Sequence, residues 1–209
     1  MKSLLNIENW PRKEHFLFFK QMEEPFFGIT TTIDCTKAYK NAKLLETTFF
    51  VYYLHKTIVA VNTIEPFRYR IIDDKIYVFD TIDVSATIMR DDSSFGFSLI
   101  EYSPDFEVFT KNTFKEIERI KNTPGLFTRE FPNENVIHFS AIPWINFTSL
   151  SHARSYTFPD SCPKISFGKM TVDENGKRTM SMSIHVHHGL MDGFHVGQLV
   201  DCFQELMNK

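Results

Sequence analysis

Apolar residues recur every three to four positions in five segments of the chain, which is the spacing of a helix with one buried face. The predicted helices span residues 12–22, 36–46, 48–62, 105–120 and 193–207. Pro11 suits a first helical position, and Asp105 is of a residue type that caps helix N-termini. The helix at 48–62 is strongly apolar, so we expect it to be buried.

Runs rich in Ile, Val, Thr and Phe predict strands between these helices. The predicted strands span residues 26–35, 68–72, 76–79, 95–101, 136–143, 165–172 and 179–187. The sequence DENGKR at 173–178 contains an Asn-Gly pair, which is typical of a hairpin between antiparallel strands. Helices and strands are mixed without regular alternation. This order predicts an α+β fold, a two-layer α/β sandwich with a mixed, largely antiparallel sheet.

No linker, repeat or low-complexity stretch divides the 209 residues, so residues 1–209 are expected to form a single domain. The net charge of −3 argues against a nucleic-acid partner. No apolar run approaches the ~18 residues of a membrane helix, and Met1–Trp10 lacks the layout of a signal peptide. We therefore expect no membrane association.

The three cysteines, Cys35, Cys162 and Cys202, are odd in number and share no short spacing. This pattern argues against a disulfide framework or a cysteine-based zinc site, and it favours the cytoplasm. Phe accounts for 22 residues, against 7 Tyr and 2 Trp. That much aromatic surface has to be buried in a core, a subunit interface or an apolar pocket.

The densest chemistry lies in Ser183–His195, where four of the eight histidines fall close together. If the strand continues through His188, alternation places His185 and His187 on one face and His188 on the other. Asp192 follows four residues after His188, and glycines flank the turn between them.

Three interpretations of this cluster are open. The histidines can be structural, which is the usual role of a single histidine in a strand. They can bind a metal, although the H-x-H-x-D-H spacing of zinc hydrolases is not present and no second ligand cluster completes a site. Alternatively, one can be a general base, because a neutral imidazole takes a proton from a hydroxyl near neutral pH.

The sequence H-H-G-L-M-D-G matches HHxxxDG, the signature of the CoA-dependent acyltransferases. Trp10–Phe16 (WPRKEHF), Ser140–Ser149 (SAIPWINFTS) and His188–His195 (HGLMDGFH) resemble segments of the chloramphenicol acetyltransferases in particular, in the same order. The resemblance extends over residues 10–207. It implies the CoA-dependent acyltransferase fold. No lipoyl domain or swinging linker accompanies it, which disfavours the related cores of 2-oxo acid dehydrogenase complexes.

The resemblance also implies catalytic roles. His188 is the implied general base, with its other ring nitrogen held by its own backbone carbonyl. Asp192 and Arg12 are implied to form a buried, bidentate ion pair, whose loss would cost roughly 3–5 kcal/mol. Ser149 is implied to stabilise the oxyanion, a contribution of about 10²–10³ in rate.

Further positions are implied to bind the substrates. Ser149, Ser166 and Lys169 match positions beside CoA, although Lys169 fits a solvated surface lysine equally well. The implied acceptor pocket contains Phe18, Phe19, Phe27 and Phe95. The acidic sequence at 23–25 and the bulky Phe97 depart from the family pattern and indicate a smaller or more polar pocket.

The leading hypothesis is therefore an O-acetyltransferase that moves the acetyl group of acetyl-CoA to a hydroxyl of chloramphenicol or a similar small molecule. It needs no metal and forms no acyl-enzyme, since no cysteine lies in a nucleophile context. The resemblance further implies a homotrimer with active sites between subunits and a role in antibiotic resistance. The alternatives are a catalytically altered homologue that acts on or binds another hydroxylated small molecule, and a metal-dependent hydrolase.

Overall fold

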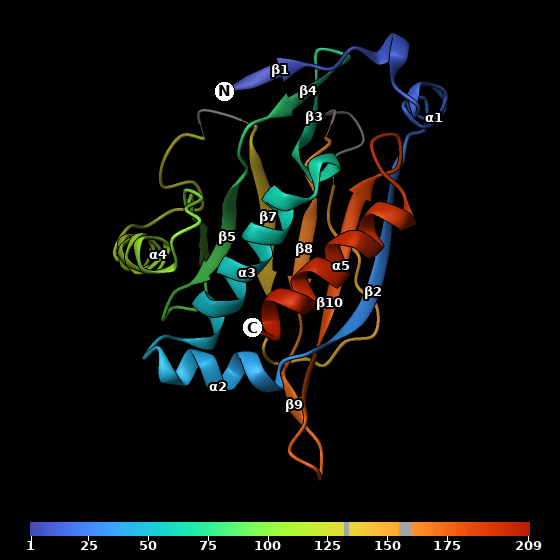
Figure 1. Ribbon diagram of the computed structural model, residues 1–209. Helices are drawn as coiled ribbons and strands as arrows, with labels where there is room; N and C mark the ends of the chain where they lie inside the picture. Colours follow the sequence, from blue (N-terminus) through green and yellow to red (C-terminus); the bar gives the residue numbers. More distant parts are fainter. Residues whose placement is uncertain (132–133, 155–159) are drawn as a thin grey trace.

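The protein is described here by a computed structural model that covers residues 1–131, 134–154 and 160–209. Its main sheet has the strand order β2-β10-β8-β7-β5-β6, and β9 pairs with β10 (Figure 1). The strands are β2 (Phe26–Asp34), β5 (Asp83–Met89), β6 (Phe95–Phe97), β7 (Val136–Ala141), β8 (Lys164–Phe167), β9 (Thr171–Val172) and β10 (Arg178–His187). Only β7 runs parallel to its neighbours, β5 and β8, and the other pairs are antiparallel. The predicted mixed, largely antiparallel sheet is confirmed.

A second, three-stranded antiparallel sheet has the order β1-β4-β3, with β1 (Lys2–Leu4), β3 (Tyr69–Ile72) and β4 (Lys75–Phe79). Asp73 and Asp74 connect β3 to β4 with φ angles of 49° and 60°. Two consecutive residues in this left-handed region form the tight turn whose twist matches a hairpin. The predicted strands at 68–72 and 76–79 are therefore confirmed, but they lie outside the main sheet.

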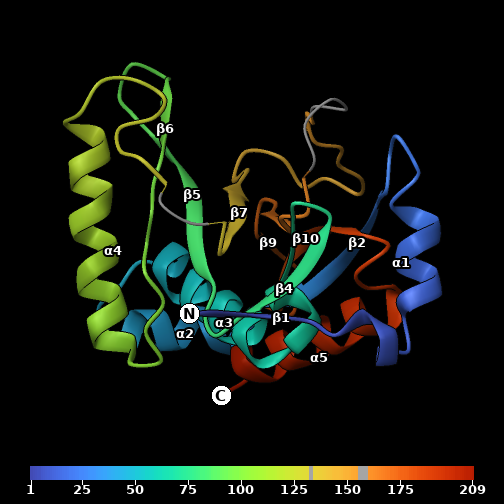
Figure 2. The same cartoon turned by 90° about the horizontal axis from the view of Figure 1, so that it is seen from above.

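The described residues form five helices beside the main sheet: α1 (Lys13–Phe19), α2 (Thr36–Leu44), α3 (Phe49–Thr63), α4 (Phe106–Lys121) and α5 (Gly193–Met207), with 3-10 turns η1 (Ile7–Asn9) and η2 (Glu65–Arg68). Thr48 and Asp105 cap α3 and α4, because their side chains accept hydrogen bonds from the backbone N–H groups of Val51 and Val108. Helices α2, α3 and α5 lie under one face of the sheet, and α1 and α4 stand at its two ends (Figure 2). The other face is open to loops, and we call it the open face.

Some predicted elements differ in extent, for local reasons. The strand expected at 165–172 is interrupted between β8 and β9, where the three residues 168–170 lie opposite two residues of β10, as in a β-bulge. The hairpin loop is also longer than the two-residue turn that Asn-Gly suggests. Only Gly176 has a positive φ, 79°, and the N–H of Asp173 bonds to the carbonyl of Lys177 at 3.0 Å. Strand β5 was not predicted, although polar residues alternate in it with the buried residues Val84, Ala86 and Ile88, because Asp83 and Ala86 are residue types that are depleted in strands.

The core lies between the main sheet and helices α3 and α5. Ile184 and Val186 of β10 are fully buried on this helix-covered side, and they face residues of α5 such as Leu199 and Phe203 that are also fully buried. The alternate residues of β10 face the open side. Strand β10 therefore has two chemically different faces: one apolar, and one rich in serine and histidine.

Gly28 makes room for one of the open-face histidines. It lies opposite His185 in the β2–β10 pairing, and a Cβ at position 28 would lie 2.4 Å from Nε2 of His185. The imidazole occupies the space that any other residue at position 28 would need.

We predict that Gly28→Ala lowers the free energy of unfolding by roughly 1–3 kcal/mol, the usual cost of overpacking. Chemical denaturation measures this change. The matched control is Gly28→Ala combined with His185→Ala: removing the ring should remove most of the cost, so the two changes should not be additive. Additive costs would contradict the steric explanation.

Candidate active site

His188 begins the turn that follows β10. Its N–H donates to the carbonyl of Pro25 at 2.8 Å, which continues the β2–β10 ladder by one residue beyond His187 and Phe26. Because alternation is kept, the ring of His188 lies on the side of Val186, and His185 and His187 lie on the open face. This is the arrangement that the sequence predicts.

The imidazole of His188 is held between two phenylalanine rings. Phe19 of α1 stacks on it with centroids 3.9 Å apart and planes 11° apart, and Phe27 of β2 lies at 4.5 Å and 44°. Nδ1 is buried and has no hydrogen-bond partner in the described part of the chain, whereas Nε2 is not among the buried unpaired atoms. The ring plane is thus set by aromatic packing, and Nε2 is the nitrogen left available to a substrate.

The implied contact between the ring of His188 and its own backbone carbonyl is not observed. That carbonyl oxygen instead accepts a hydrogen bond from Nη2 of Arg12 at 3.0 Å. The other terminal nitrogen, Nη1, lies 2.5 Å from Oδ2 of Asp192. The expected bidentate pair is therefore wrong in its geometry: the guanidinium bridges a carboxylate and a main-chain carbonyl.

The ion pair is also only partly buried. The side chain of Arg12 is 12% exposed and that of Asp192 is 34% exposed. Burial alone would raise the pKa of the Asp192 carboxyl, but the charges of Arg12 and His195 and the hydrogen bonds that it accepts lower the pKa overall. With a third of the carboxylate in water, the 3–5 kcal/mol of a fully buried pair is too large an expectation.

Asp192 has a second structural task as the N-cap of α5. Its Oδ1 accepts from the backbone N–H of Phe194 at 3.0 Å, and Nδ1 of His195 lies 2.9 Å from the same oxygen. One carboxylate thus ends the turn that begins at His188, starts α5 and anchors Arg12.

Ser149 lies in a loop over the open face. Close to it, the carbonyl of Leu150 accepts a hydrogen bond from His185, and Phe147 lies against Gly168. Ser149 itself is exposed. Within one chain, Ser149 and His188 are therefore on opposite sides of β10, and the structure does not bring these two predicted residues together.

The two other predicted CoA-side residues belong to the same region as Ser149. Ser166 of β8 is fully buried on the open face, with Oγ 3.4 Å from Nε2 of His152. Lys169 has an exposed side chain, and its N–H donates to the carbonyl of Ile145 at 2.8 Å. Both residues therefore adjoin the loop that carries Ser149.

The open face also carries a histidine group that sequence reasoning did not connect. The rings of His152 and His185 meet edge to face with centroids 4.8 Å apart. The pKa of His152 is lowered to about 4 by burial and by the charges of the nearby His185 and Lys164. The pKa of His187 is lowered to about 4, mainly by burial. These rings are neutral near pH 7. His152 gave no signal because an isolated histidine in a loop has no pattern around it. Within the described ranges, no three His, Cys, Asp or Glu side chains gather closely enough to hold a metal ion.

The four predicted pocket phenylalanines fall into separate places. Phe19 and Phe27 contact His188, and Phe18 lies against Phe19 at 5.1 Å but is 59% exposed. Phe95 lies in β6, at the opposite edge of the sheet from β2 (Figure 2). The four residues therefore lie at two opposite edges of the sheet, and one chain does not bring them together.

The acidic sequence at 23–25 has a partner that the sequence did not reveal. Glu24 forms an ion pair with Arg154 and accepts from the N–H of Phe26 at 2.9 Å, and the Arg154 guanidinium lies 4.0 Å from the centroid of the Phe26 ring. The charge of Glu24 is thus matched by a neighbouring cation, which weakens the inference of a more polar acceptor pocket.

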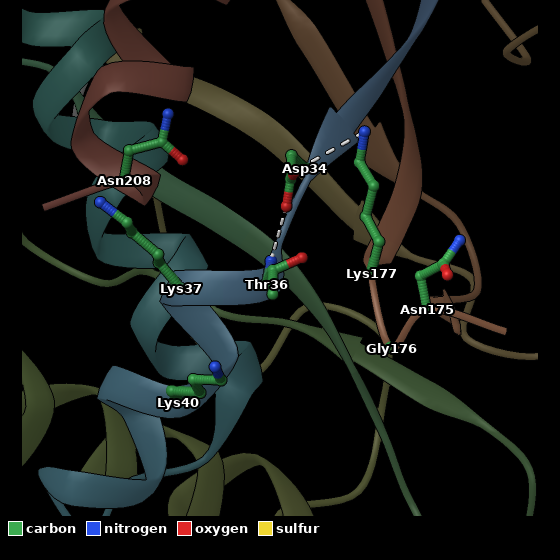
Figure 3. Close-up of a pocket in the computed structure, with 8 residues that line it drawn as sticks. All are labelled: Asp34, Thr36, Lys37, Lys40, Asn175, Gly176, Lys177 and Asn208. Carbon is green, nitrogen blue, oxygen red and sulfur yellow. Dashed lines mark hydrogen bonds and ion pairs between the residues drawn. The ribbon is translucent and has the colours of Figure 1, made fainter. Parts of the chain in front are cut away.

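A recess of about 510 Å³ lies elsewhere, where β2 ends and α2 begins (Figure 3). Its lining includes Asp34, Thr36 and Lys177. Asp34 accepts a hydrogen bond from the N–H of Thr36 and forms an ion pair with Lys177. None of the predicted site residues lines this recess. It lies at the far end of β2 from His188, because Phe26 and Asp34 mark opposite ends of that strand.

The fold, with the HHxxxDG sequence where β10 ends beside the edge strand β2, is that of the CoA-dependent acyltransferases. A solved structure described as a probable dihydrolipoamide acetyltransferase from Listeria monocytogenes shares this fold, with a TM-score of 0.66 at 14% identity over 93% of this chain and 88% of that one.

The family model for chloramphenicol acetyltransferase matches residues 2–204. Chloramphenicol acetyltransferase 3 of Escherichia coli is 30% identical over 98% of this chain and 96% of its own length, and the Campylobacter coli enzyme is 29% identical over 98% of both. A solved chloramphenicol acetyltransferase superposes with a TM-score of 0.87 at 29% identity, over 99% of this chain and all of the other. The chain belongs to the chloramphenicol acetyltransferase family. No helix in the described residues is long and apolar enough to cross a bilayer.

We predict that Asp192→Asn costs about 1–2 kcal/mol of unfolding free energy, because asparagine still caps α5 while the charge beside Arg12 is lost. Thermal or urea denaturation at pH 7 measures this loss. The pKa of the Asp192 carboxyl is lower in the folded chain than in the unfolded chain. The extra stability of the wild type over the variant is therefore present above the ordinary carboxyl pKa, and it disappears as the pH falls through the lowered pKa of the folded chain. An advantage that persisted under strongly acidic conditions would contradict the charge-based explanation.

Proposed function

We propose that this protein transfers the acetyl group of acetyl-CoA to a hydroxyl of chloramphenicol. The observation that carries the proposal is the imidazole of His188, clamped between Phe19 and Phe27 with Nε2 left available. The relatives at 28–30% identity over nearly the whole chain are named for chloramphenicol, which favours this acceptor over a different hydroxylated molecule.

His188 acts as the general base in this proposal. Nε2 takes the proton of the acceptor hydroxyl as that oxygen attacks the thioester carbonyl, and it returns the proton to the departing CoA sulfur. The stacked ring of Phe19 and the tilted ring of Phe27 keep the imidazole plane fixed through both proton transfers. Arg12 and Asp192 position the turn and do not move protons.

Ser149 acts on the opposite side of the reaction. Its exposed hydroxyl donates to the carbonyl oxygen as negative charge develops there. Ser166 and Lys169, which adjoin the Ser149 loop, lie on the CoA side. Lys169 has an exposed side chain that can bind a phosphate group, and Ser166 supports the loop through His152.

The two halves of this site come from different subunits in our proposal. His188 with Phe19 and Phe27 lies on one side of β10, and Ser149 lies over the open face, so a site that contains both needs two copies of the chain. We propose the homotrimer that the family resemblance implies. Large apolar side chains near both halves are exposed, Trp144 by 64%, Ile145 by 57% and Phe194 by 71%, as expected for surfaces that a second subunit covers.

Two broader features complete the proposal. We place the enzyme in the cytoplasm, because Cys35, Cys162 and Cys202 are all free thiols, which suits a reducing compartment. We also infer that residues 1–209 act as one catalytic domain, since a single hydrophobic cluster extends from Phe16 to Met207.

Thiol release from acetyl-CoA in the presence of chloramphenicol tests the chemistry. We expect His188→Ala to lower kcat by about 10²–10⁴, the usual contribution of a general base. We expect Ser149→Ala to lower it by about 10²–10³, with a smaller effect on KM. Ser151→Ala, two residues along the same exposed loop, is the matched control and should keep most of its turnover. Undiminished activity in His188→Ala would refute the mechanism.

Mixed oligomers test the shared site. Each of the two inactive variants keeps the half that the other lacks, so co-expressed or co-refolded His188→Ala and Ser149→Ala chains should regain activity. If equal amounts of the two variant chains assemble at random into cyclic trimers, roughly a quarter of the sites contain both an intact His188 and an intact Ser149. Mixed oligomers that stay as inactive as their parents, while each parent alone forms a trimer, would show that both residues come from one subunit.

A further inference from the structure

Three phenylalanine rings gather at the β6 edge of the main sheet. Phe95 and Phe97 are the first and last residues of β6, and their ring centroids are 5.6 Å apart. Phe127 follows α4 in the chain, and its ring centroid lies 5.2 Å from that of Phe97. Phe95 is 45% exposed and Phe127 is 69% exposed. Apolar rings that gather in contact with water indicate a binding surface, and we call these three residues the edge phenylalanines.

The edge phenylalanines come from two segments that share few backbone hydrogen bonds. The N–H of Phe97 donates to the carbonyl of Leu126 at 3.0 Å, and Phe97 and Phe127 form an isolated parallel bridge. Strand β6 has three residues and pairs with β5. A short edge strand and a loop have little rigidity of their own. Side-chain contacts therefore have to fix the two segments relative to each other.

The guanidinium of Arg90 makes this connection. Arg90 directly follows β5 and is 9% exposed. Its Nε donates to the carbonyl of Ile120 at 2.9 Å, and its Nη2 donates to the carbonyls of Thr123 at 2.8 Å and Gly125 at 2.7 Å. These carbonyls belong to the end of α4 and to the segment that leads to Phe127. A cation suits this place, because the carbonyls at a helix C-terminus carry partial negative charge.

The same residue also holds the turn that leads into β6. Nη1 of Arg90 donates to the hydroxyl of Ser94 at 3.2 Å, and the N–H of Arg90 donates to the carbonyl of Ser94 at 2.8 Å. Gly96, the middle residue of β6, leaves room for the guanidinium, since a Cβ at position 96 would lie 2.5 Å from Nη2. A larger residue there would push Nη2 away from the carbonyls of Thr123 and Gly125. Arg90 therefore joins both segments that carry the edge phenylalanines.

A second arginine holds the loop on the other side of Phe127. Nε of Arg119 lies 2.7 Å from a carboxylate oxygen of Glu116, and Nη2 of Arg119 donates to the hydroxyl of Thr128 at 3.0 Å. The main chain is thus fixed on both sides of Phe127, while the ring of Phe127 is exposed. A ring on a fixed loop loses little conformational entropy when a ligand packs on it.

We propose that Arg90 is a positioning residue for the acceptor in acetyl transfer, and this inference rests on the function proposed above. The edge phenylalanines form one wall of the acceptor pocket, as the family resemblance implies for Phe95, and Arg90 sets the separation of the two segments that make this wall. The guanidinium itself binds main chain and takes no part in the proton transfers. Because His188 and Phe27 lie at the opposite edge of the sheet, the wall serves the site of a neighbouring subunit.

Steady-state kinetics on the assembled enzyme, with chloramphenicol and acetyl-CoA varied separately, test this role. We expect Arg90→Gln to raise KM for chloramphenicol by about tenfold, the size expected when an aromatic contact to a ligand is lost. Both kcat and KM for acetyl-CoA should stay within about twofold of the wild type, since the base and the CoA side are unchanged. The matched control is Arg68→Gln. Arg68 also donates to a main-chain carbonyl, that of Phe79, but it lies in η2, so all three parameters should be unchanged.

Gly96→Ala tests the position of the guanidinium instead of its presence. The added methyl group displaces the guanidinium of Arg90, so KM for chloramphenicol should rise as it does in Arg90→Gln. In the double variant the methyl group has no guanidinium to displace, so the two effects should not multiply. Effects that multiply would show that the two residues act independently, and they would overturn the positioning role.

The remaining outcomes separate this inference from the proposed function. An unchanged KM for chloramphenicol in an active Arg90→Gln enzyme would overturn the inference and leave the function intact. A parallel loss of kcat and of affinity for both substrates would also overturn it, because that pattern marks a general structural role. A wild-type enzyme that does not acetylate chloramphenicol would refute the proposed function itself, and the inference with it.

Discussion

The bridge made by Arg12 is the interaction on which the geometry of the candidate site depends. One guanidinium joins the start of α1 to both ends of the turn between β10 and α5, through the carbonyl of His188 and the carboxylate of Asp192. Because α1 carries Phe19, the same bridge also sets the ring that stacks on the imidazole. A contact between residues 180 positions apart in the sequence thus controls the orientation of the proposed base.

The two faces of β10 impose the second constraint. The strand is buried on both sides, but one side is apolar core and the other is a polar surface of serine and histidine. The change of face between His187 and His188 separates the proposed base from the loop of Ser149. An assembly of several chains follows from this separation if the two residues share one reaction, and the exposed aromatic side chains of the monomer are consistent with it.

Much of this arrangement could be predicted from the sequence, and the exceptions have physical causes. Helix α5 has the predicted bounds because Asp192 is both a motif residue and a cap, and the alternation of His185, His187 and His188 followed from strand geometry alone. Strand β5 was missed although its polar and apolar residues alternate, because Asp83 and Ala86 are residue types that are depleted in strands.

Side-chain partners were the least predictable feature. The pairing of Arg12 with Asp192 was expected from the family resemblance. The second hydrogen bond of the same guanidinium, to the carbonyl of His188, was not expected. The ion pair of Glu24 with Arg154 leaves no local pattern in the sequence, since it joins distant segments. The four phenylalanines of the expected acceptor pocket were implied by the family resemblance, and the sequence around a phenylalanine does not show which neighbour will cover its ring.

The pairing of β2 with β10 has a consequence for how the chain folds. The two strands are separated by about 150 residues, and they form the longest ladder in the main sheet. Contacts this distant close a large loop and form slowly. During synthesis β2 emerges early and must wait, with an unpaired hydrogen-bonding edge, until nearly the whole chain has left the ribosome. The proposed base is therefore placed at one of the last steps of folding, and conditions that slow this closure should favour aggregation through β2.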